Sequence, residues 1–464
     1  MNNRSWPALA VAALTLAGAI GAGPPTVVAA TTGPTTSSGA SGTTIAVPDD
    51  FATIQEAVDS AAAGDLILVS PGVYHEAVNV DTDNLTIRGL DRNEVVLDGE
   101  FELDNGIRVL GANGVVVENM TAINYTANGF FWTGVDGYRG SYLSAYRIGL
   151  YGIYAFDSVN GQLDNSYGGG SGDAGFYVGQ CFPCNAVVES VVAEYNGIGF
   201  SGTNAGGDLY IVNSRFNNNR VGIVPNSGSY ELCYPQREVT LAGNLVYSNN
   251  ESSTPAIPDA ILAMGNGIVV AGGIGDTVVN NRVDDHAKTG IALVPYLEES
   301  PSDDQPGDDE LERPCADTKD DPVNMEPPDA LLWQPRDNVV TGNIVSDSGV
   351  ADLTVASVDT DLSTLGNCFA GNEFTSSAPE AVETLAPCDG DGEGDWDAGA
   401  LDLLPWIVEA QNAPEPPDYE TAEIPALEPQ ENMPGAAGAP ADPADDLEID
   451  VDVASIEVPD GPAG

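Results

Sequence analysis

Three aromatic residues recur along the chain at a constant interval. Phe131, Tyr154 and Tyr177 follow one another 23 residues apart. Aromatic rings stack on the apolar faces of sugar rings, and carboxamide groups hydrogen-bond sugar hydroxyls. The spacing therefore predicts a carbohydrate-binding surface, if the fold brings these positions to one side. Polar residues a few positions further on, in the unit of Tyr177 and the next two units, complete this predicted surface: Gln180, Asn204 and Asn226.

Charged residues near the aromatics could carry catalysis. Two carboxyl groups can act as general acid and general base on a glycosidic bond. An arginine could neutralise a uronate, or act as the base of a lyase with calcium held by an aspartate. The two histidines of the chain, His75 and His286, do not suggest a Ser-His-Asp triad. The candidate catalytic residues are Asp136, Asp157, Asp173, Arg139 and Arg147.

The six cysteines are even in number, which allows three disulfides. Cys181-Phe-Pro-Cys184 is a C-x-x-C, which can be redox-active, metal-binding or a turn disulfide. We favour the disulfide, because no second C-x-x-C and no nearby histidine completes a zinc or copper site. Cys368 and Cys388 flank the last strand and are expected to pair. Cys233 and Cys315 could pair and tie two irregular segments together.

A repeat positions all these residues. A glycine followed by a large apolar residue recurs from Gly106 to Gly222 at intervals of 23, 23, 23, 24 and 23, and resumes at Gly267 and Gly290. A period of roughly 20 to 50 residues is typical of a solenoid. The residue after each glycine should point inward and the next one outward. The outward column is Arg108, Phe131, Tyr154, Tyr177, Ser201 and Val224.

Each unit also contains a second apolar run with an asparagine near its centre. These runs are rich in Val and Ile and are bounded by Gly and Asn, so they predict strands. The spacing of leucine-rich repeats is missing. We therefore predict an all-β solenoid of about 23 residues per rung, with two or three short strands per rung. Stacked asparagines at its turns would satisfy backbone groups.

Residues 50–63 place apolar side chains at helical spacing and predict a short helix. Asp50 can cap its start and Gly64 can end it. Such a helix would cover the open end of the first rung, where backbone groups and core are otherwise exposed.

The run TIQEAVDSAAAGDLILVSPGVYHEAVNV at residues 53–80, followed by NLTIRG and VVLDG, resembles a known opening. It is similar to right-handed parallel β-helix proteins of the pectin-lyase-like superfamily. Pectin methylesterases and the periplasmic copper-processing accessory proteins of nitrous oxide reductase open in this way. The resemblance covers about residues 45–375 and implies a right-handed parallel β-helix. The catalytic motifs of polygalacturonases, pectate lyases and pectin methylesterases are not recognisable in the chain.

The N-terminus is predicted to direct export. In residues 1–30, Arg4 precedes an Ala-rich apolar run that is too short for a convincing membrane span, and small residues follow. We interpret this segment as a secretory signal, with an uncleaved anchor as the alternative. Residues 31–44 form a flexible Thr/Ser/Gly linker. The mature chain is expected to be secreted, at the cell surface or extracellular, without membrane insertion.

Three segments depart from the repeat within and after the globular part, residues 45–388. Residues 228–263 add one rung or a long loop, and 297–337 are Pro-rich and acidic. Such insertions often lie beside the binding surface, although solvated decoration is the alternative. The aromatic stripe could also pack under 228–263. Residues 389–464 carry 21 acids and no Lys, Arg or His, which predicts a mostly disordered tail, with 401–408 able to dock.

The charge balance excludes some classes of partner. Fourteen Lys and Arg against 71 Asp and Glu leave a formal net charge of −57. This excludes a nucleic-acid binder that works through a basic surface and argues against docking on anionic lipid. The excess of acid with only two lysines is typical of proteins that stay soluble in concentrated salt. An acidic, calcium-rich extracellular protein is the alternative.

We interpret the chain as a secreted β-helix protein that binds an extracellular polysaccharide and could cleave or modify it. As an enzyme it would be a lyase, a glycoside hydrolase or an epimerase. A non-catalytic adhesion solenoid and a copper-processing accessory protein remain alternatives. No metal site is assigned, because the acidic run 389–397 fails the spacing of an EF-hand. Calcium is the one cofactor that the residues suggest, and the oligomeric state stays open.

Overall fold

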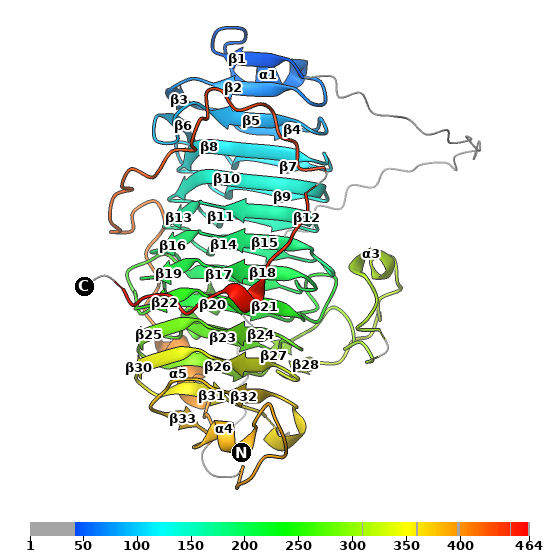
Figure 1. Ribbon diagram of the computed structural model, residues 1–464, viewed down its shortest axis with the longest axis vertical. Helices are drawn as coiled ribbons and strands as arrows, with labels where there is room; N and C mark the ends of the chain where they lie inside the picture. Colours follow the sequence, from blue (N-terminus) through cyan, green and yellow to red (C-terminus); the bar gives the residue numbers. More distant parts are fainter. Residues whose placement is uncertain (1–41, 309, 359–360, 397–399, 446, 463–464) are drawn as a thin grey trace, which may run out of the picture. The chain divides into compact units, whose positions relative to one another are not determined.

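Each rung of the coil contributes up to three short strands, and each strand pairs in parallel with its counterpart one rung further along (Figure 1). Ile153 pairs with Phe130 on one side and with Phe176 on the other, so one rung spans 23 residues. The chain is a right-handed parallel β-helix, as predicted. The structure is a computed structural model that describes residues 42–308, 310–358, 361–396, 400–445 and 447–462. The predicted signal 1–30 and most of the linker 31–44 lie outside these residues.

The strands form three ladders. The first and second ladders belong to one 20-stranded sheet, because β8 and β10 run through both. Asn119 and Tyr142, with φ angles of 55° and 52°, turn the corner inside these two strands. The first ladder contains β1 (Thr44–Val47), β2 (Leu66–Val69), β5 (Thr86–Gly89), β8 (Val115–Ile123), β10 (Asp136–Tyr146), β12 (Val159–Asp164), β15 (Ala186–Glu189), β18 (Leu209–Val212), β21 (Val239–Ala242), β24 (Thr277–Val279), β29 (Val339–Thr341) and β32 (Cys368–Ala370).

The second ladder shares β8 and β10 and adds β3 (Gly72–Tyr74), β6 (Val95–Asp98), β13 (Tyr167–Gly169), β16 (Val192–Glu194), β19 (Arg215–Asn217), β22 (Leu245–Tyr247), β25 (Arg282–His286) and β30 (Ile344–Ser348). The third ladder is an 11-stranded sheet of its own. It contains β4 (Val78–Val80), β7 (Asn105–Leu110), β9 (Asn128–Thr133), β11 (Tyr151–Phe156), β14 (Ala174–Gly179), β17 (Ile198–Thr203), β20 (Val221–Asn226), β23 (Ile268–Ala271), β26 (Thr289–Val294), β31 (Ala351–Val355) and β33 (Ser377–Ala378).

The recurring glycine is required by the close approach of neighbouring rungs. A Cβ atom at Gly106 would lie 2.5 Å from the carbonyl oxygen of Gly129, and one at Gly129 would lie 2.6 Å from that of Gly152. No side chain fits there without moving backbone. The residue after each glycine points into the core, as predicted. Fully buried members of this column are Ile107, Phe130, Ile153, Phe176, Phe200, Ile223, Ile268 and Ile291.

Asparagines stack along a corner of the coil. The backbone N–H of Asn244 donates to Asn281 Oδ1 at 3.0 Å, that of Asn281 to Asn343 Oδ1 at 2.9 Å, and that of Asn343 to Asn372 Oδ1 at 3.0 Å. Buried backbone groups at a corner cannot bond to water, so the side chains replace the missing strand partners. The asparagines therefore have the structural role that the sequence predicted.

The predicted helix over the first rung is α1 (Ile54–Ser60). Its cap is Thr53, whose Oγ1 accepts a hydrogen bond from the backbone N–H of Glu56 at 3.1 Å, and not Asp50. Asp50 is unavailable because its carboxylate accepts from the backbone N–H of Ala46 at 2.9 Å.

The helix α1 also ends earlier than predicted, with Ala61 as its C-cap and not Gly64. At the other end of the coil, α4 (Val382–Leu385) buries Val382 and Leu385. Both ends of the core are thus covered by a short helix. A 3₁₀ turn, η1 (Leu362–Thr364), precedes β32.

The two predicted insertions leave the coil as three segments. The expected insertion 228–263 is two loops, 227–238 and 248–267, on either side of β21 and β22. It is not an extra rung, because β21 and β22 pair regularly with the strands before and after them. The second loop contains α2 (Pro258–Leu262). The segment 295–338 contains α3 (Cys315–Thr318) and the antiparallel hairpin of β27 (Tyr296–Glu299) and β28 (Ala330–Trp333).

Disulfides join Cys181 to Cys184, Cys233 to Cys315, and Cys368 to Cys388. These are the pairs that the sequence suggested. The second pair ties loop 227–238 to segment 295–338. Both segments emerge between the third and first ladders, so they form one irregular layer beside the third ladder.

The acidic tail differs from the expected disorder in its described residues, 400–445 and 447–462. Its helix α5 (Leu404–Asn412) buries Trp406 against Ala260 and Val269. This contact places the predicted docking segment 401–408 on the body. The remainder runs back along the coil to Arg88 on β5 and then returns to Arg282 on β25, in orange and red, with the 3₁₀ turn η2 (Val453–Ser455) in the returning part (Figure 1). No helix among the described residues is both long and apolar enough to cross a membrane.

Neutral acceptors explain why such an acidic segment stays on an acidic body. Buried guanidinium groups require hydrogen-bond acceptors, and the backbone carbonyls of the tail supply them. Composition predicted repulsion because it counts side-chain charges and not these carbonyls. The contacts run from Arg88 to Ala439 O (2.7 Å) and Pro440 O (3.0 Å), from Arg92 to Glu431 O (3.1 Å), from Arg147 to Ala422 O (2.8 Å), and from Arg282 to Pro459 O (2.8 Å).

Candidate functional site

The predicted aromatic stripe is continuous across three rungs of the third ladder. Phe131 on β9, Tyr154 on β11 and Tyr177 on β14 are partners in register. Their ring centroids lie 4.8 Å apart for Phe131 and Tyr154, and 4.7 Å apart for Tyr154 and Tyr177. Phe131 and Tyr154 are half-buried. Tyr177 is buried at 1% exposure, so the prediction that its side chain faces solvent is wrong.

A fourth ring completes this cluster and was missed by the sequence analysis. The centroid of Tyr151 lies 4.6 Å from that of Tyr154 and 4.8 Å from that of Tyr177. Tyr151 precedes Gly152, so simple strand alternation places it on the inward side. Its contacts with Tyr154 and Tyr177 place it on the outward side, although it is the first residue of β11 (Tyr151–Phe156). We call Phe131, Tyr151, Tyr154 and Tyr177 the ring cluster.

Loop 227–238 covers one end of the ring cluster. The hydroxyl of Tyr177 donates to both carboxyl oxygens of Glu231, at 2.7 and 2.6 Å. The alternative that the stripe packs under an insertion therefore holds for Tyr177. It does not hold for Phe131 and Tyr154, whose rings keep exposed area.

The three polar residues predicted to bind sugar hold this same loop. Gln180 Oε1 accepts from the backbone N–H of Leu232 at 2.8 Å. Asn204 Nδ2 donates to the carbonyls of Gly228 and Glu231, at 2.6 and 2.8 Å. Asn226 Nδ2 donates to the Tyr230 hydroxyl at 2.7 Å. The repeat placed these residues in the correct columns, but their hydrogen-bonding capacity is used by protein.

Two carboxyl groups lie at the covered end with pKa values raised towards neutrality. Burial raises the pKa of Asp173 to about 7; a hydrogen bond from Tyr151 opposes this and the charge of Asp259 adds to it. Burial raises the pKa of Glu231 to about 8; the bond from Tyr177 opposes this and Asp173 adds to it. Near neutral pH such groups can both give and take a proton. Burial also raises the pKa of Tyr151 and Tyr177 well above the usual value, so their hydroxyls stay neutral.

The structure separates the five predicted catalytic residues. Asp173 joins the ring cluster, and Asp157, one residue beyond β11, flanks it as an ion pair with Lys319. Asp136 is exposed on the first ladder and accepts from Asn160 Nδ2 at 2.5 Å. Asp136 and the ring cluster are close in sequence because one rung spans only 23 residues, but they lie on different ladders of the coil.

Arg139 and Arg147 face the acidic tail and not the ring cluster. Arg139 pairs with Glu118 and with Asp442 of the tail, and Glu118 also binds Arg88 at 2.6 Å. Arg147 donates to tail carbonyls. Glu118, fully buried between two arginines, was not anticipated because nothing in the repeat marks it.

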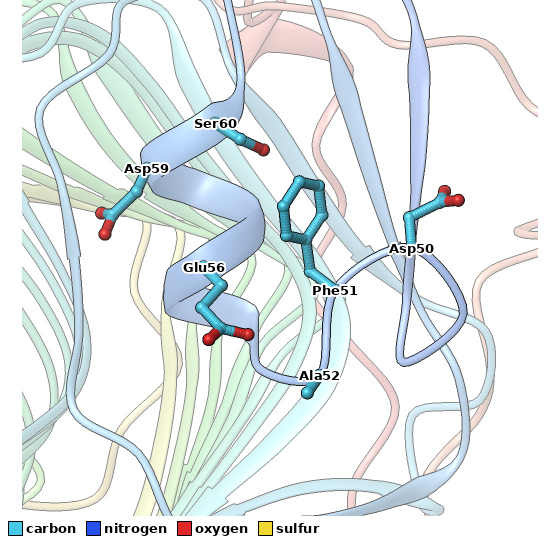
Figure 2. A pocket seen from close by; sticks show the side chains of 6 residues that line it. All are labelled: Asp50, Phe51, Ala52, Glu56, Asp59 and Ser60. Atoms are coloured by element: carbon cyan, nitrogen blue, oxygen red, sulfur yellow. The ribbon is translucent and has the colours of Figure 1, made fainter.

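A pocket of about 390 Å³ lies beside the N-terminal cap, between α1 and the loop before it (Figure 2). Its lining is Asp50, Phe51, Ala52, Glu56, Asp59 and Ser60. These residues belong to the cap, and the ring cluster is several rungs away, so we assign the pocket no function. Across the described parts of the chain, no group of three or more His, Cys, Asp and Glu side chains is arranged to hold a metal ion.

Comparisons with known proteins agree with the coil. Residues 128–296 match the family model described as right handed beta helix region. No curated protein matches the chain. Taken with the three parallel ladders, the match shows that the fold is a right-handed parallel β-helix.

Solved structures with the same kind of coil have low sequence identity to this chain. The A-module of the Azotobacter vinelandii mannuronan C-5 epimerase AlgE4 is 16% identical, with 70% of this chain and 91% of that chain covered and a TM-score of 0.44. An alginate lyase from Paenibacillus sp. str. FPU-7 is 14% identical, with 71% and 99% covered and a TM-score of 0.41. Pectate lyase Pel9A is 11% identical, with 76% and 84% covered and a TM-score of 0.36.

Proposed function

We propose that the ring cluster binds a polysaccharide and that Asp173 and Glu231 transfer protons on the bound sugar. The observation that carries this proposal is the junction of the ring cluster with two carboxyl groups of raised pKa, the buried Asp173 and the half-buried Glu231. Buried titratable groups with perturbed pKa values are enriched at catalytic sites. Half-buried rings next to them supply a stacking surface for sugar.

The two carboxyl groups would have different roles. Glu231, with a pKa of about 8, is mainly protonated at neutral pH and would donate a proton to a leaving oxygen. Asp173, with a pKa of about 7, is partly ionised and would act as the base. Tyr177 and Tyr151 would position these carboxyls through their hydroxyls.

The second candidate is a non-catalytic binding solenoid. The observation that favours it is the burial of Tyr177 and Asp173, at 1% and 7% exposure. A reacting sugar would need loop 227–238 to yield some room, whereas simple stacking needs only Phe131 and Tyr154. The copper-processing alternative has less support, because Cys181 and Cys184 form a disulfide and offer no free thiols.

Export is part of the proposal. Three disulfides are compatible with an oxidising compartment, and the N-terminal 30 residues have the pattern of a secretory signal. A polysaccharide outside the cell would then be the partner.

The test uses the full chain and a panel of polysaccharides, with assays for new reducing ends and for unsaturated uronate. Asp173→Asn and Glu231→Gln should each lower turnover about 10²–10⁴-fold while binding is retained. Tyr154→Ala should weaken binding, and Tyr247→Ala on the second ladder is the matched control. Binding without turnover on any glycan would establish the adhesion alternative. Unchanged binding in Tyr154→Ala would show that the ring cluster is not the site.

A further inference from the structure

We infer that the ring cluster takes an uncharged glycan and not a uronate polymer. The inference rests on the proposed function and names the substrate class of the same site. Four features carry it: the pairing of the nearby cations, the acids at the covered end, the neutral hydroxyls between them, and the location of the other cations.

The cations beside the ring cluster are already compensated. Arg108 is the register partner of Phe131, one rung before the cluster. Its guanidinium lies 3.7 Å from Asp104 Oδ2 and donates to Asn79 Oδ1 at 2.9 Å. Lys319 forms an ion pair with Asp157 at the end of β11. A uronate carboxylate would therefore have to share either cation with an aspartate.

The covered end of the cluster is acidic. The charge of Asp259 raises the pKa of Asp173, and the charge of Asp173 raises that of Glu231, so these carboxyls are close enough to repel one another. A uronate polymer would bring a further carboxylate with every sugar. The ionised fraction of Asp173 and the charge of Asp259 would repel that carboxylate, and the charge on Asp173 is only weakly screened because the side chain is buried.

The groups left to recognise a ligand are neutral. Burial raises the pKa of the Tyr154 hydroxyl, as it does for Tyr151 and Tyr177. Neutral hydroxyls and protonated carboxyls donate and accept hydrogen bonds, which matches the hydroxyl groups of an uncharged sugar.

Half of the twelve other cations in the sequence lie elsewhere, under the acidic tail. Six of the fourteen Lys and Arg residues contact tail residues 409–459. The six are Arg88, Arg92, Arg139, Arg147, Arg282 and Lys288.

The test compares polygalacturonate with carboxyl-reduced polygalacturonate, which has the same linkage and no charge. Binding to the full chain is measured by calorimetry at the lowest salt concentration at which circular dichroism shows a folded protein. The reduced polymer should bind at least about tenfold more tightly. The ratio should fall in the double variant Asp173→Asn/Glu231→Gln and stay unchanged in Asp136→Asn, an exposed aspartate on the first ladder. Xylan and a neutral β-glucan are measured in parallel.

The outcomes separate the inference from the function on which it rests. If unreduced polygalacturonate binds as tightly as the reduced form or more tightly, and Tyr154→Ala weakens both, the site binds sugar but the substrate class is wrong. If Tyr154→Ala weakens binding to none of the four polymers, or none of them binds, the proposed function fails and the inference fails with it.

Discussion

The hydroxyl of Tyr177 donates to both carboxyl oxygens of Glu231, although 54 residues separate the two in sequence. Tyr177 belongs to the rigid third ladder and Glu231 to loop 227–238. The bond therefore fixes an irregular loop onto the regular coil at the point where the ring cluster ends. Because the carboxyl is buried there, its titration is coupled to the packing of that loop.

We predict that Glu231→Gln flattens the pH dependence of stability. Burial raises the Glu231 pKa from 4.5 to about 8, so above pH 4.5 the folded protein holds a proton that the unfolded chain releases. The stabilisation is complete below pH 4.5 and is lost as the pH rises through 8. When the free energy of unfolding is plotted against pH, the curves of parent and variant should converge or cross. Their slopes should differ by an amount on the order of 1 kcal/mol per pH unit.

Denaturant unfolding between pH 5 and 9 measures this effect. Glu299→Gln, an exposed glutamate on β27, is the control and should follow the parent at every pH. Parallel curves for parent and Glu231→Gln would mean that the carboxyl is not buried as the structure has it.

Asp276 lies in a row with Asn338 and Asn367, which stack along a corner of the coil. Its backbone N–H donates to Asn338 Oδ1 at 2.8 Å, as that of Asn338 does to Asn367 Oδ1 at 3.0 Å. Asn338 Nδ2 also donates to Asn367 Oδ1 at 2.9 Å, whereas among the described residues Asp276 Oδ2 and Gln236 Oε1 are buried without partners. Burial raises the pKa of Asp276 to about 7.

Asp276→Asn should therefore stabilise the protein at pH 8 by about 1–3 kcal/mol, because the new amide can donate where an ionised carboxylate cannot. The gain should shrink between pH 7 and pH 4, where the folded state holds the Asp276 proton and the carboxyl can donate. Asp347→Asn, at an exposed position, should change neither stability nor its pH dependence. If Asp276→Asn stabilised the protein equally at pH 4 and pH 8, the ionised carboxylate of Asp276 would not be the origin of the effect.

The sequence was informative wherever the repeat reaches. The Gly106 column and the spacing of Phe131, Tyr154 and Tyr177 follow from contacts between successive rungs, which impose the same geometry each time. Glu231 could not be found in this way, because its loop belongs to one rung only and has no counterpart against which to align it.

The tail shows a different gap between composition and structure. Its 21 acids predicted disorder, yet Arg88 and Arg92 are buried at 1% and 2% exposure beneath it. Besides the ion pairs of Asp442 with Arg139 and of Glu409 with Lys288, backbone carbonyls and a few apolar side chains hold the tail, and neither of these is visible in net charge. Gln180 and Asn204 are a similar case. The repeat predicted their columns, but it did not predict that loop 227–238 would use their hydrogen-bonding groups.

Ile456 should anchor the last described part of the tail. It packs with Val187, Val212 and Ala242 on the first ladder, and its carbonyl accepts from Asn280 Nδ2 at 2.7 Å. Burial of an isoleucine contributes about 1.5–3 kcal/mol. Ile456→Ala should therefore raise hydrogen exchange in 447–462 about tenfold or more while the ladders stay protected. Glu457→Ala, an exposed neighbour, is the control, and equal protection in both variants would show that the tail is held elsewhere.

The stability of the whole chain should depend on salt. With −57 formal charges, self-repulsion opposes the compact state. Removing the 21 acids of the tail would leave −57 + 21 = −36 on the rest, so the repulsion is not confined to the tail. Each rung contacts only its neighbours, so the core extends along the coil and each rung opposes the repulsion only through contacts with adjacent rungs.

Screening relieves this repulsion, because the Debye length falls from about 10 Å at 0.1 M to about 3 Å at 1 M. The melting temperature of the full chain should rise steeply across this range. Truncation after residue 388 should lower the melting temperature at every salt concentration, because buried arginines lose their acceptors. The dependence of the melting temperature on salt concentration should be mostly retained. Sucrose at matched osmolality is the control for solute exclusion and should produce a smaller rise. A melting temperature that is flat across the salt series would show that the acidity has no role in stability.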